Sequence, residues 1–202
     1  MSERVPLAAR AALRQELRRR RAALPSGQRE TAHRQVALHL SRTGWLRPGL
    51  RVGIYSATGS ELDTAPILQL LHRHRCLSYF PRITSRRAQQ MTFARATTTE
   101  RRNSYGILEP TSLTRVSAQD LQLILLPLVG FDAYGHRLGS GAGYYDRALG
   151  FRRLRRHWIG PKLVGIAYEC QRVDELAVRP TDIPLDAVIT ERGIAFFSGE
   201  TT

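Results

Sequence analysis

Apolar and polar residues follow two different periods along this chain, which predicts alternating helices and strands. A helix is expected over residues 7–23, because Leu13, Leu17 and Leu24 fall on one stripe of it. A second helix is expected over about 28–42, after a break rich in proline, serine and glycine.

Short apolar runs predict the strands that follow. The further elements that we expect are a strand at 50–56, a helix at 62–74 with Pro66 in its first turn, strands at 76–80, 91–94 and 121–129, a helix near 143–157, and strands at 164–168, 186–189 and 194–197. Residues 95–118 are polar and rich in turn formers, so we expect a surface excursion there.

This order of elements favours an α/β fold, a three-layer sandwich whose mostly parallel sheet carries helices on both faces. Strands that read as continuous apolar runs are typical of parallel sheets covered on both sides. The fold is therefore Rossmann-like, and residues 1–202 are expected to form a single domain. Ligands of such sheets bind beyond the carboxyl ends of the strands, where the loop at 130–143 would lie.

The composition fits a globular protein that works in a reducing compartment. The chain has 202 residues, of which 42% are hydrophobic, and no apolar run approaches the roughly 18 residues that span a membrane. The N-terminus lacks the apolar segment of a secretory signal. The two cysteines, Cys76 and Cys170, show no paired spacing, and the histidines show no zinc-binding pattern. We expect a cytoplasmic monomer with no membrane partner.

The formal net charge of +14 comes almost entirely from arginine. Two runs stand out, at 18–21 and 152–156, and Arg10, Arg14 and Arg21 share a stripe of the first helix. Two arginines one turn apart can converge on one anion, so a polyanion such as ATP or nucleic acid is one interpretation. The alternative, which we favour for most of these residues, is that they fill solvated helix faces.

A glycine-rich loop between the strand at 121–129 and the next helix is the most informative feature. Glycines at 139, 141 and 143 would let the backbone approach phosphate oxygens, and Arg137 could grip a phosphate. Asp146, just inside the helix, could hold a Mg²⁺ that bridges phosphates. The loop lacks the lysine of a P-loop and does not fit the dinucleotide-binding pattern. A tight strand-to-helix turn remains an alternative.

The whole segment resembles the 5-formyltetrahydrofolate cyclo-ligase family. Its pattern is matched by Pro127, Phe131, Asp132, Gly135, Arg137, Leu138, Gly139, Gly141, Gly143, Tyr144, Tyr145 and Asp146. Four further segments are similar to the family in the same order: the basic helix around Arg10, the Glu61-Leu-Asp-Thr64 segment, residues 103–110, and the closing strands at 164–168 and 182–190.

The resemblance implies an enzyme that converts 5-formyltetrahydrofolate to 5,10-methenyltetrahydrofolate with ATP as co-substrate and Mg²⁺ as cofactor. ATP would phosphorylate the formyl oxygen, and N10 would then displace phosphate as the ring closes. Such chemistry depends on positioning and charge neutralisation. We therefore expect small-molecule substrates and no protein nucleophile.

The resemblance also implies the site residues. ATP would contact Arg10, Arg14, Arg137, Leu138, Gly139, Ser140, Gly141, Ala142, Gly143, Tyr144 and Tyr145. The folate substrate would contact Ser56, Glu61, Tyr144 and Tyr145, with Phe131 and Tyr105 as further wall residues. Mg²⁺ would be held by Asp146 and Asp182, Arg137 would stabilise phosphate charge, and Asp132 would fix the loop by local hydrogen bonds.

Three residues depart from the family pattern. Arg10 stands where lysine is common, Ala142 where some members have lysine, and Thr181 where many have histidine or tryptophan. Each site residue also has a plain structural interpretation, such as an exposed basic helix for Arg10 and Arg14. Two other functions therefore stay open: an RNA-associated basic protein, although no RNA-recognition motif is present, and an inactive or repurposed member of the family.

Overall fold

The computed structural model describes residues 7–96, 100–102, 108–110, 114–154 and 160–197. Its helices are α1 (Leu7–Ala22), α2 (Ser26–Ser41), α3 (Ala65–Arg73), α4 (Tyr144–Ala148) and α5 (Phe151–Leu154), with 3-10 helices η1 (Ala118–Asp120) and η2 (Glu169–Gln171). Within these ranges, every helix is too short or too polar to cross a membrane.

The strands of the described residues form one eight-stranded sheet and two small ones. The large sheet contains β1 (Arg51–Gly53), β2 (Leu77–Ser85), β3 (Gln90–Arg95), β6 (Arg115–Val116), β7 (Leu123–Pro127), β10 (Lys162–Ile166), β11 (Ala187–Thr190) and β12 (Gly193–Phe196). The small sheets pair β4 (Glu100–Arg102) with β5 (Leu108–Pro110), and β8 (Gly130–Phe131) with β9 (Arg137–Leu138).

The strand order in the large sheet is β12-β11-β10-β7-β1-β2-β3-β6. The five central strands, from β11 to β2, are parallel, whereas β12, β3 and β6 run antiparallel to their neighbours. The mostly parallel sheet that the apolar runs predicted is therefore confirmed.

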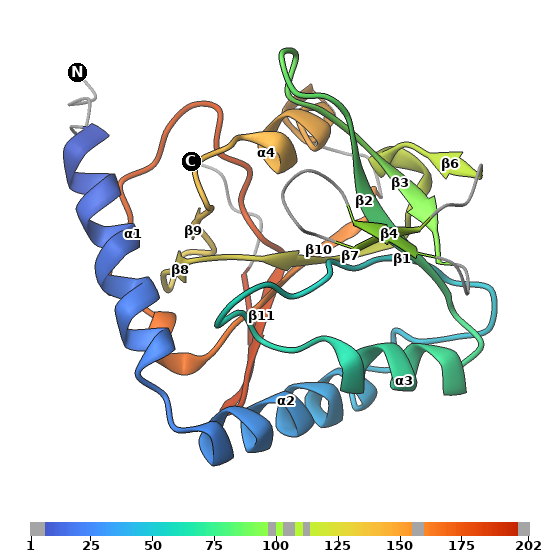
Figure 1. Ribbon diagram of the computed structural model, residues 1–202, viewed down its shortest axis with the longest axis horizontal. Helices are drawn as coiled ribbons and strands as arrows, with labels where there is room; N and C mark the ends of the chain where they lie inside the picture. The colour runs from blue at the N-terminus through green and yellow to red at the C-terminus, as the bar shows by residue number, and fades with distance from the viewer. Residues whose placement is uncertain (1–6, 97–99, 103–107, 111–113, 155–159, 198–202) are drawn as a thin grey trace.

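Both faces of the sheet are covered, and β7 shows why its sequence is a continuous apolar run. Leu123 and Leu125 pack in the cluster that holds the apolar sides of α2 and α3. Ile124 and Leu126 point the other way, into a second cluster with residues of α4, α5 and the segment before β11. Figure 1 shows α2 and α3 below the sheet and α4 above it.

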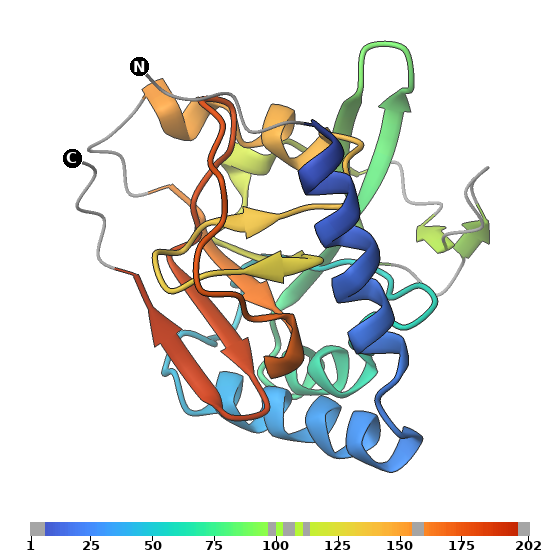
Figure 2. The ribbon, with the colours of Figure 1, turned by 90° about the vertical axis from the view of Figure 1, so that its left-hand side faces the viewer.

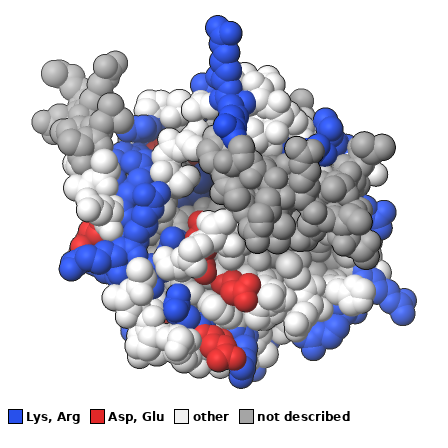
Figure 3. All heavy atoms as spheres, viewed as in Figure 1, with Lys and Arg blue, Asp and Glu red and all other residues white. Residues whose placement is uncertain are grey.

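The first helix, α1, lies along one side of the molecule, against the β8–β9 hairpin (Figure 2). Its Leu17 is wholly buried and packs with Val129, Leu138 and Leu176. The basic side chains of α1 gather along the left of the face shown in Figure 3. The apolar stripe predicted from the sequence thus packs α1 against the rest of the protein. The arginines of α1 lie beside the glycine-rich loop.

The topology places a crevice between β1 and β7. The chain passes from β1 to β2 on one side of this pair and from β7 to β10 on the other. In parallel α/β sheets, ligands bind at the carboxyl ends of strands whose connections diverge in this way. Residues after β1 and residues after β7 therefore face one another at the edge where a ligand is expected.

The strand predicted at 121–129 is shorter in the structure, where it covers Leu123–Pro127. β7 ends at Pro127, whose ring removes the N–H that would continue the ladder, and the chain then turns into the separate β8–β9 hairpin. The loop predicted over 130–143 therefore contains two short paired strands. Each of these strands has only two residues, which is too few to show the alternation of apolar and polar side chains that predicts a strand.

Other boundaries differ for physical reasons. The helix expected near 143–157 is interrupted at Leu149 and Gly150, since glycine disfavours a helix interior, and residues 155–159 lie outside the described part of the chain. The stretch at 95–118 contains β4, β5 and β6, which are short and polar. The helix expected from residue 62 begins at Ala65, directly before Pro66.

Candidate active site

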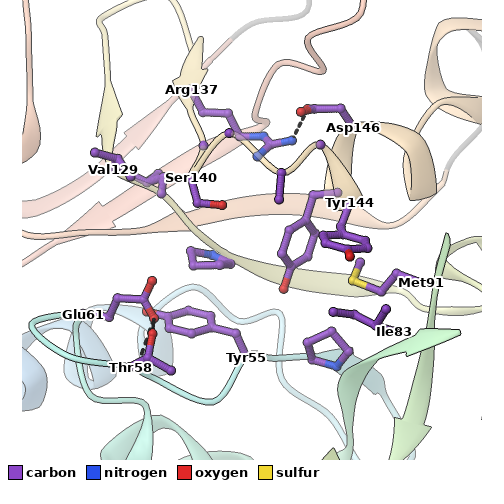
Figure 4. Close-up of a pocket in the computed structure, with 18 of the residues that line it drawn as sticks. Tyr55, Thr58, Glu61, Ile83, Met91, Val129, Arg137, Ser140, Tyr144 and Asp146 are labelled. Carbon is purple, nitrogen blue, oxygen red and sulfur yellow. Dashed lines mark hydrogen bonds and ion pairs between the residues drawn. The ribbon is translucent and has the colours of Figure 1, made fainter. Parts of the chain in front are cut away.

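The first cavity opens at the carboxyl ends of β1 and β7 and has a volume of about 420 Å³. Its walls come from the residues after β1, the β2–β3 hairpin, the end of β7 and the glycine-rich loop with α4 (Figure 4). Most of its lining surface is apolar, and its larger apolar and aromatic residues are Tyr55, Pro81, Ile83, Met91, Pro127, Leu128, Val129, Tyr144 and Tyr145. A cavity of this size and character suits an organic ligand.

Glu61 supplies a carboxylate to this cavity. Its Oε2 accepts hydrogen bonds from the backbone N–H of Thr58 at 3.0 Å and from the Thr58 hydroxyl at 3.2 Å. In Figure 4, Glu61 lies on the wall opposite Arg137. The cavity therefore carries a negative group on one side and a positive group on the other.

Two tyrosines also line this cavity, the buried Tyr55 and the half-buried Tyr145. Burial raises the pKa of Tyr145, Arg137 acts to lower it, and Glu61 raises it. Burial also raises the pKa of Tyr55, whose hydroxyl donates to the Leu62 carbonyl at 3.1 Å. Both phenols therefore stay neutral at ordinary pH, and they present ring surface with a polar tip to a bound molecule.

The second cavity, of about 470 Å³, lies between α1, the glycine-rich loop, α4, α5 and the segment that leads to Asp182. Its arginines are Arg10, Arg14, Arg137, Arg147, Arg153 and Arg179. Asp146 and Asp182 are the two acids among its lining residues. Cationic side chains thus outnumber acidic ones by four, so this cavity suits a polyanion.

Residues of α1 hold the walls of the second cavity in place. The Nη1 of Arg10 donates to Asp182 Oδ2 and to the Ala177 carbonyl, both at 2.8 Å. Arg14 Nε donates to the Gly139 carbonyl at 2.8 Å, and Arg18 donates to the Ser140 carbonyl at 3.3 Å. The helix therefore fixes both the glycine-rich loop and the segment before Asp182.

A shared wall separates the two cavities. It consists of Arg137, Gly139, Gly141, Ala142, Gly143 and Asp146, which line both. Arg137 is 5% exposed and pairs through Nη2 with Asp146 Oδ1. Arg10 is 7% exposed, and the buried Nε atoms of both arginines lack a partner within the described residues. Each guanidinium therefore keeps donor capacity for a ligand.

The backbone of the loop requires glycine at two positions. Gly141 has φ +106° and Gly143 has φ +74°, a region that other residues rarely adopt. Gly143 precedes α4, which has only five residues. The dipole of so short a helix is small, so the positive charge at this cavity comes mainly from its arginines.

Asp146 and Asp182 fit the requirements of a Mg²⁺ ion that is bound together with phosphates. Mg²⁺ usually takes one or two carboxylates and completes its shell with water and phosphate oxygens. No cluster of three or more His, Cys, Asp or Glu residues in the described ranges is arranged to hold a metal ion. Two carboxylates on one cavity therefore make a site that a nucleotide would complete.

The structure brings most of the predicted site residues to the two cavities. Ser56, Glu61, Ser140, Tyr144 and Tyr145 line the first one, and Arg10, Arg14 and Asp182 line the second.

Three predicted residues line neither cavity, and one cannot be placed. Leu138 and Phe131 are buried in the interior, and Arg172 lies over the Phe131 ring. Asp132 is structural, as expected, because it accepts the backbone N–H groups of Tyr134 and His136 at 2.9 Å. Tyr105 lies outside the described residues.

Sequence reasoning missed several wall residues. In the first cavity these are Pro81, Ile83 and Met91 of the β2–β3 hairpin; in the second they include Gln89, Arg147, Arg153 and Arg179. The spacing of Pro81 and Ile83 on one face of a strand was a usable signal. For Arg147, Arg153 and Arg179, no local sequence pattern distinguished arginines that line the cavity from the many that are exposed on the surface.

Comparison with known proteins agrees with this geometry. The model of the 5-formyltetrahydrofolate cyclo-ligase family matches residues 6–191. The 5-formyltetrahydrofolate cyclo-ligase of Escherichia coli is 33% identical over 180 residues, covering 86% of this chain and 96% of that protein. That of Haemophilus influenzae is 30% identical over 179 residues, covering 86% and 92%. The structure of Aquifex aeolicus 5,10-methenyltetrahydrofolate synthetase aligns with a TM-score of 0.79 at 25% identity, covering 96% of this chain and 95% of that one.

Proposed function

Because the chain belongs to the 5-formyltetrahydrofolate cyclo-ligase family, we propose that it converts 5-formyltetrahydrofolate to 5,10-methenyltetrahydrofolate and consumes ATP. The observation that best supports this proposal is the pair of cavities that share one wall. One cavity is mostly apolar and the other is strongly cationic, as a folate and a nucleoside triphosphate would require.

The folate would occupy the first cavity. Glu61 would accept hydrogen bonds from the adjacent N–H groups of the pterin, and Tyr144 and Tyr145 would lie against its rings. Ser56, at the carboxyl end of β1, would contribute a polar contact. The triphosphate of ATP would occupy the second cavity, where Arg10 and Arg14 from α1 meet the glycine-rich loop.

The reaction needs activation because a formamide oxygen is a poor leaving group. The formyl oxygen would attack the γ-phosphorus of ATP, so that an O–P bond forms and ADP leaves. N10 would then attack the formyl carbon and lose its proton. The C–O bond breaks, and phosphate departs with the former formyl oxygen. Alignment and charge neutralisation carry such a transfer, so no protein nucleophile is needed.

Arg137 would stabilise the charge on the transferred phosphate, since it lies on the wall between the two cavities. Asp146 and Asp182 would hold Mg²⁺, which neutralises charge on the phosphates when bound. In the structure, Asp146 pairs with Arg137 and Asp182 with Arg10. Entry of the metal–nucleotide complex would therefore move these arginines from carboxylate to phosphate partners.

An absorbance assay tests the proposed reaction. Purified protein is mixed with 5-formyltetrahydrofolate and Mg-ATP, and the near-ultraviolet band of the methenyl product is followed. We expect a rise that disappears when ATP is omitted or when the metal is removed with a chelator. A flat trace from folded protein in the complete mixture would contradict the proposal and favour a repurposed member of the family.

A further inference from the structure

We propose that Arg179 binds the phosphates of the nucleotide, as a cationic contact that reaches the second cavity from outside both α1 and the glycine-rich loop. This inference rests on the proposed function and adds a residue to its nucleotide site. Arg179 belongs to the segment between η2 and β11, which lines the cavity together with Thr181 and Asp182.

The segment that carries Arg179 is firmly held. Arg10 donates to the Ala177 carbonyl and to Asp182, and Arg153 Nη1 donates to the Thr181 carbonyl at 2.8 Å. Two hydrogen bonds between Arg179 and Asp182 close a turn. The Arg179 N–H donates to the Asp182 carboxylate Oδ2 at 3.0 Å, and the Asp182 N–H donates to the Arg179 carbonyl at 2.9 Å. The wall is therefore positioned before any ligand arrives.

The guanidinium of Arg179 contrasts with those of the other cavity arginines. Those of Arg10 and Arg137 pair with carboxylates, and those of Arg14, Arg147 and Arg153 donate to backbone carbonyls. The hydrogen bonds that the structure describes for Arg179 are made by its backbone N–H and carbonyl groups. Among the six arginines of this cavity, Arg179 thus has the side chain least held by hydrogen bonds and ion pairs to the described residues.

Electrostatics around Arg14 show that these charges lie close enough to repel one another. Burial lowers the pKa of Arg14, and the positive charges of Arg10 and Arg179 lower it further, with Asp182 acting in the opposite direction. Like charges gathered in one cavity cost stability until an anion enters. Residues 139–143 of the glycine-rich loop include no Lys or Arg, so the positive charge beside the phosphates must come from other segments of the chain.

The test measures binding of Mg-ATP, and of tripolyphosphate as a probe without the nucleoside, by calorimetry. Arg179→Gln should raise the dissociation constant of both probes about tenfold, since a hydrogen bond to a charged group is lost. Arg179→Lys should restore part of the affinity. The KM for ATP should rise by a similar factor, while the KM for 5-formyltetrahydrofolate stays unchanged.

Arg73→Gln is the matched control, because Arg73 is an exposed arginine of α3 on the other face of the sheet. It should bind both probes as the wild type does. Equal affinity of Arg179→Gln and Arg73→Gln for Mg-ATP would overturn the role of Arg179 while leaving the proposed function intact. Failure of the wild-type protein to bind Mg-ATP at all would instead overturn the proposed function, and this inference with it.

Discussion

At the residue scale, the first cavity works through a separation of charge. Glu61 and Arg137 lie on opposite walls of this cavity. They act on the pKa of Tyr145 in opposite directions, since Arg137 lowers it and Glu61 raises it. A folate that fills this cavity would meet a hydrogen-bond acceptor on one side and a phosphate-stabilising cation on the other. The proposed function therefore gives the two residues separable tasks, binding for Glu61 and chemistry for Arg137.

Replacing Glu61 tests this division directly. Glu61→Gln keeps the size of the side chain and an oxygen that can accept from Thr58, but it removes the charge. We expect the KM for 5-formyltetrahydrofolate to rise about tenfold, because a charge-assisted hydrogen bond is lost. The KM for ATP should be unchanged in the same steady-state assays.

Asp63→Asn provides the control for this measurement. Asp63 is exposed, lies two residues away and outside both cavities, and its Oδ1 accepts from the Ala65 N–H, as an asparagine oxygen also can. It should leave both KM values as they are. If Glu61→Gln behaved like Asp63→Asn, Glu61 would not be a folate ligand.

The sequence alone identified the candidate site residues that lie close to one another along the chain. Gly141 and Gly143 are required by their positive φ values, and Arg137 and Asp146 are tied to them by spacing. Met91 was missed because its place on the wall depends on how the β2–β3 hairpin folds over α4. That contact joins residues more than fifty positions apart, which no local pattern records.

At the scale of elements, α1 links the interior to the glycine-rich loop, which lines both cavities. Its Leu17 is fixed in a small apolar cluster with Leu138, the residue next to Arg137. The same helix hydrogen-bonds the loop carbonyls through Arg14 and Arg18. A shift of α1 would therefore move the loop and the cavity arginines together.

Shortening Leu17 should reveal this link. Leu17→Ala leaves a void beneath α1, and we expect the free energy of unfolding to fall by about 3 kcal/mol in urea titrations. The KM for ATP should also rise severalfold, because α1 carries Arg10 and Arg14. Leu70→Ala, in α3, removes a similarly buried leucine from the other face of the sheet. It should cost comparable stability without changing the KM for ATP. An unchanged KM for ATP in Leu17→Ala would show that α1 does not position the site.

The elements themselves were predictable where one face of each is apolar. The runs that became β7, β10 and β11 indicated a parallel sheet, and the stripe of α1 was correct. The β8–β9 hairpin and the division between α4 and α5 were not predicted. They depend on single residues, Pro127 and Gly150, which end an element without changing its polarity.

At the scale of the whole molecule, the charge of +14 has a specific focus. The arginines of the run at 18–21 differ in their surroundings. Arg19 and Arg20 pair with Glu16 in solvent, the exposed Arg18 donates to the Ser140 carbonyl, and the buried Arg21 donates to the Ser60 hydroxyl. The interpretation as solvated helix faces therefore holds for Arg19 and Arg20, whereas anion binding by other arginines stays a prediction. Six arginines line one cavity, which suits a small polyanion better than a long nucleic acid, whose phosphates need an extended surface.

Under the proposed function the two substrates meet at the shared wall, so the most direct test follows the formyl oxygen. The protein is given 5-formyltetrahydrofolate labelled with ¹⁸O in the formyl group, together with Mg-ATP in ordinary water, and the released phosphate is analysed by mass spectrometry. Direct attack on the γ-phosphorus predicts one ¹⁸O atom in each phosphate, formed in step with the methenyl product. Unlabelled phosphate, with the methenyl product still formed, would contradict phosphoryl transfer to the formyl oxygen across this wall.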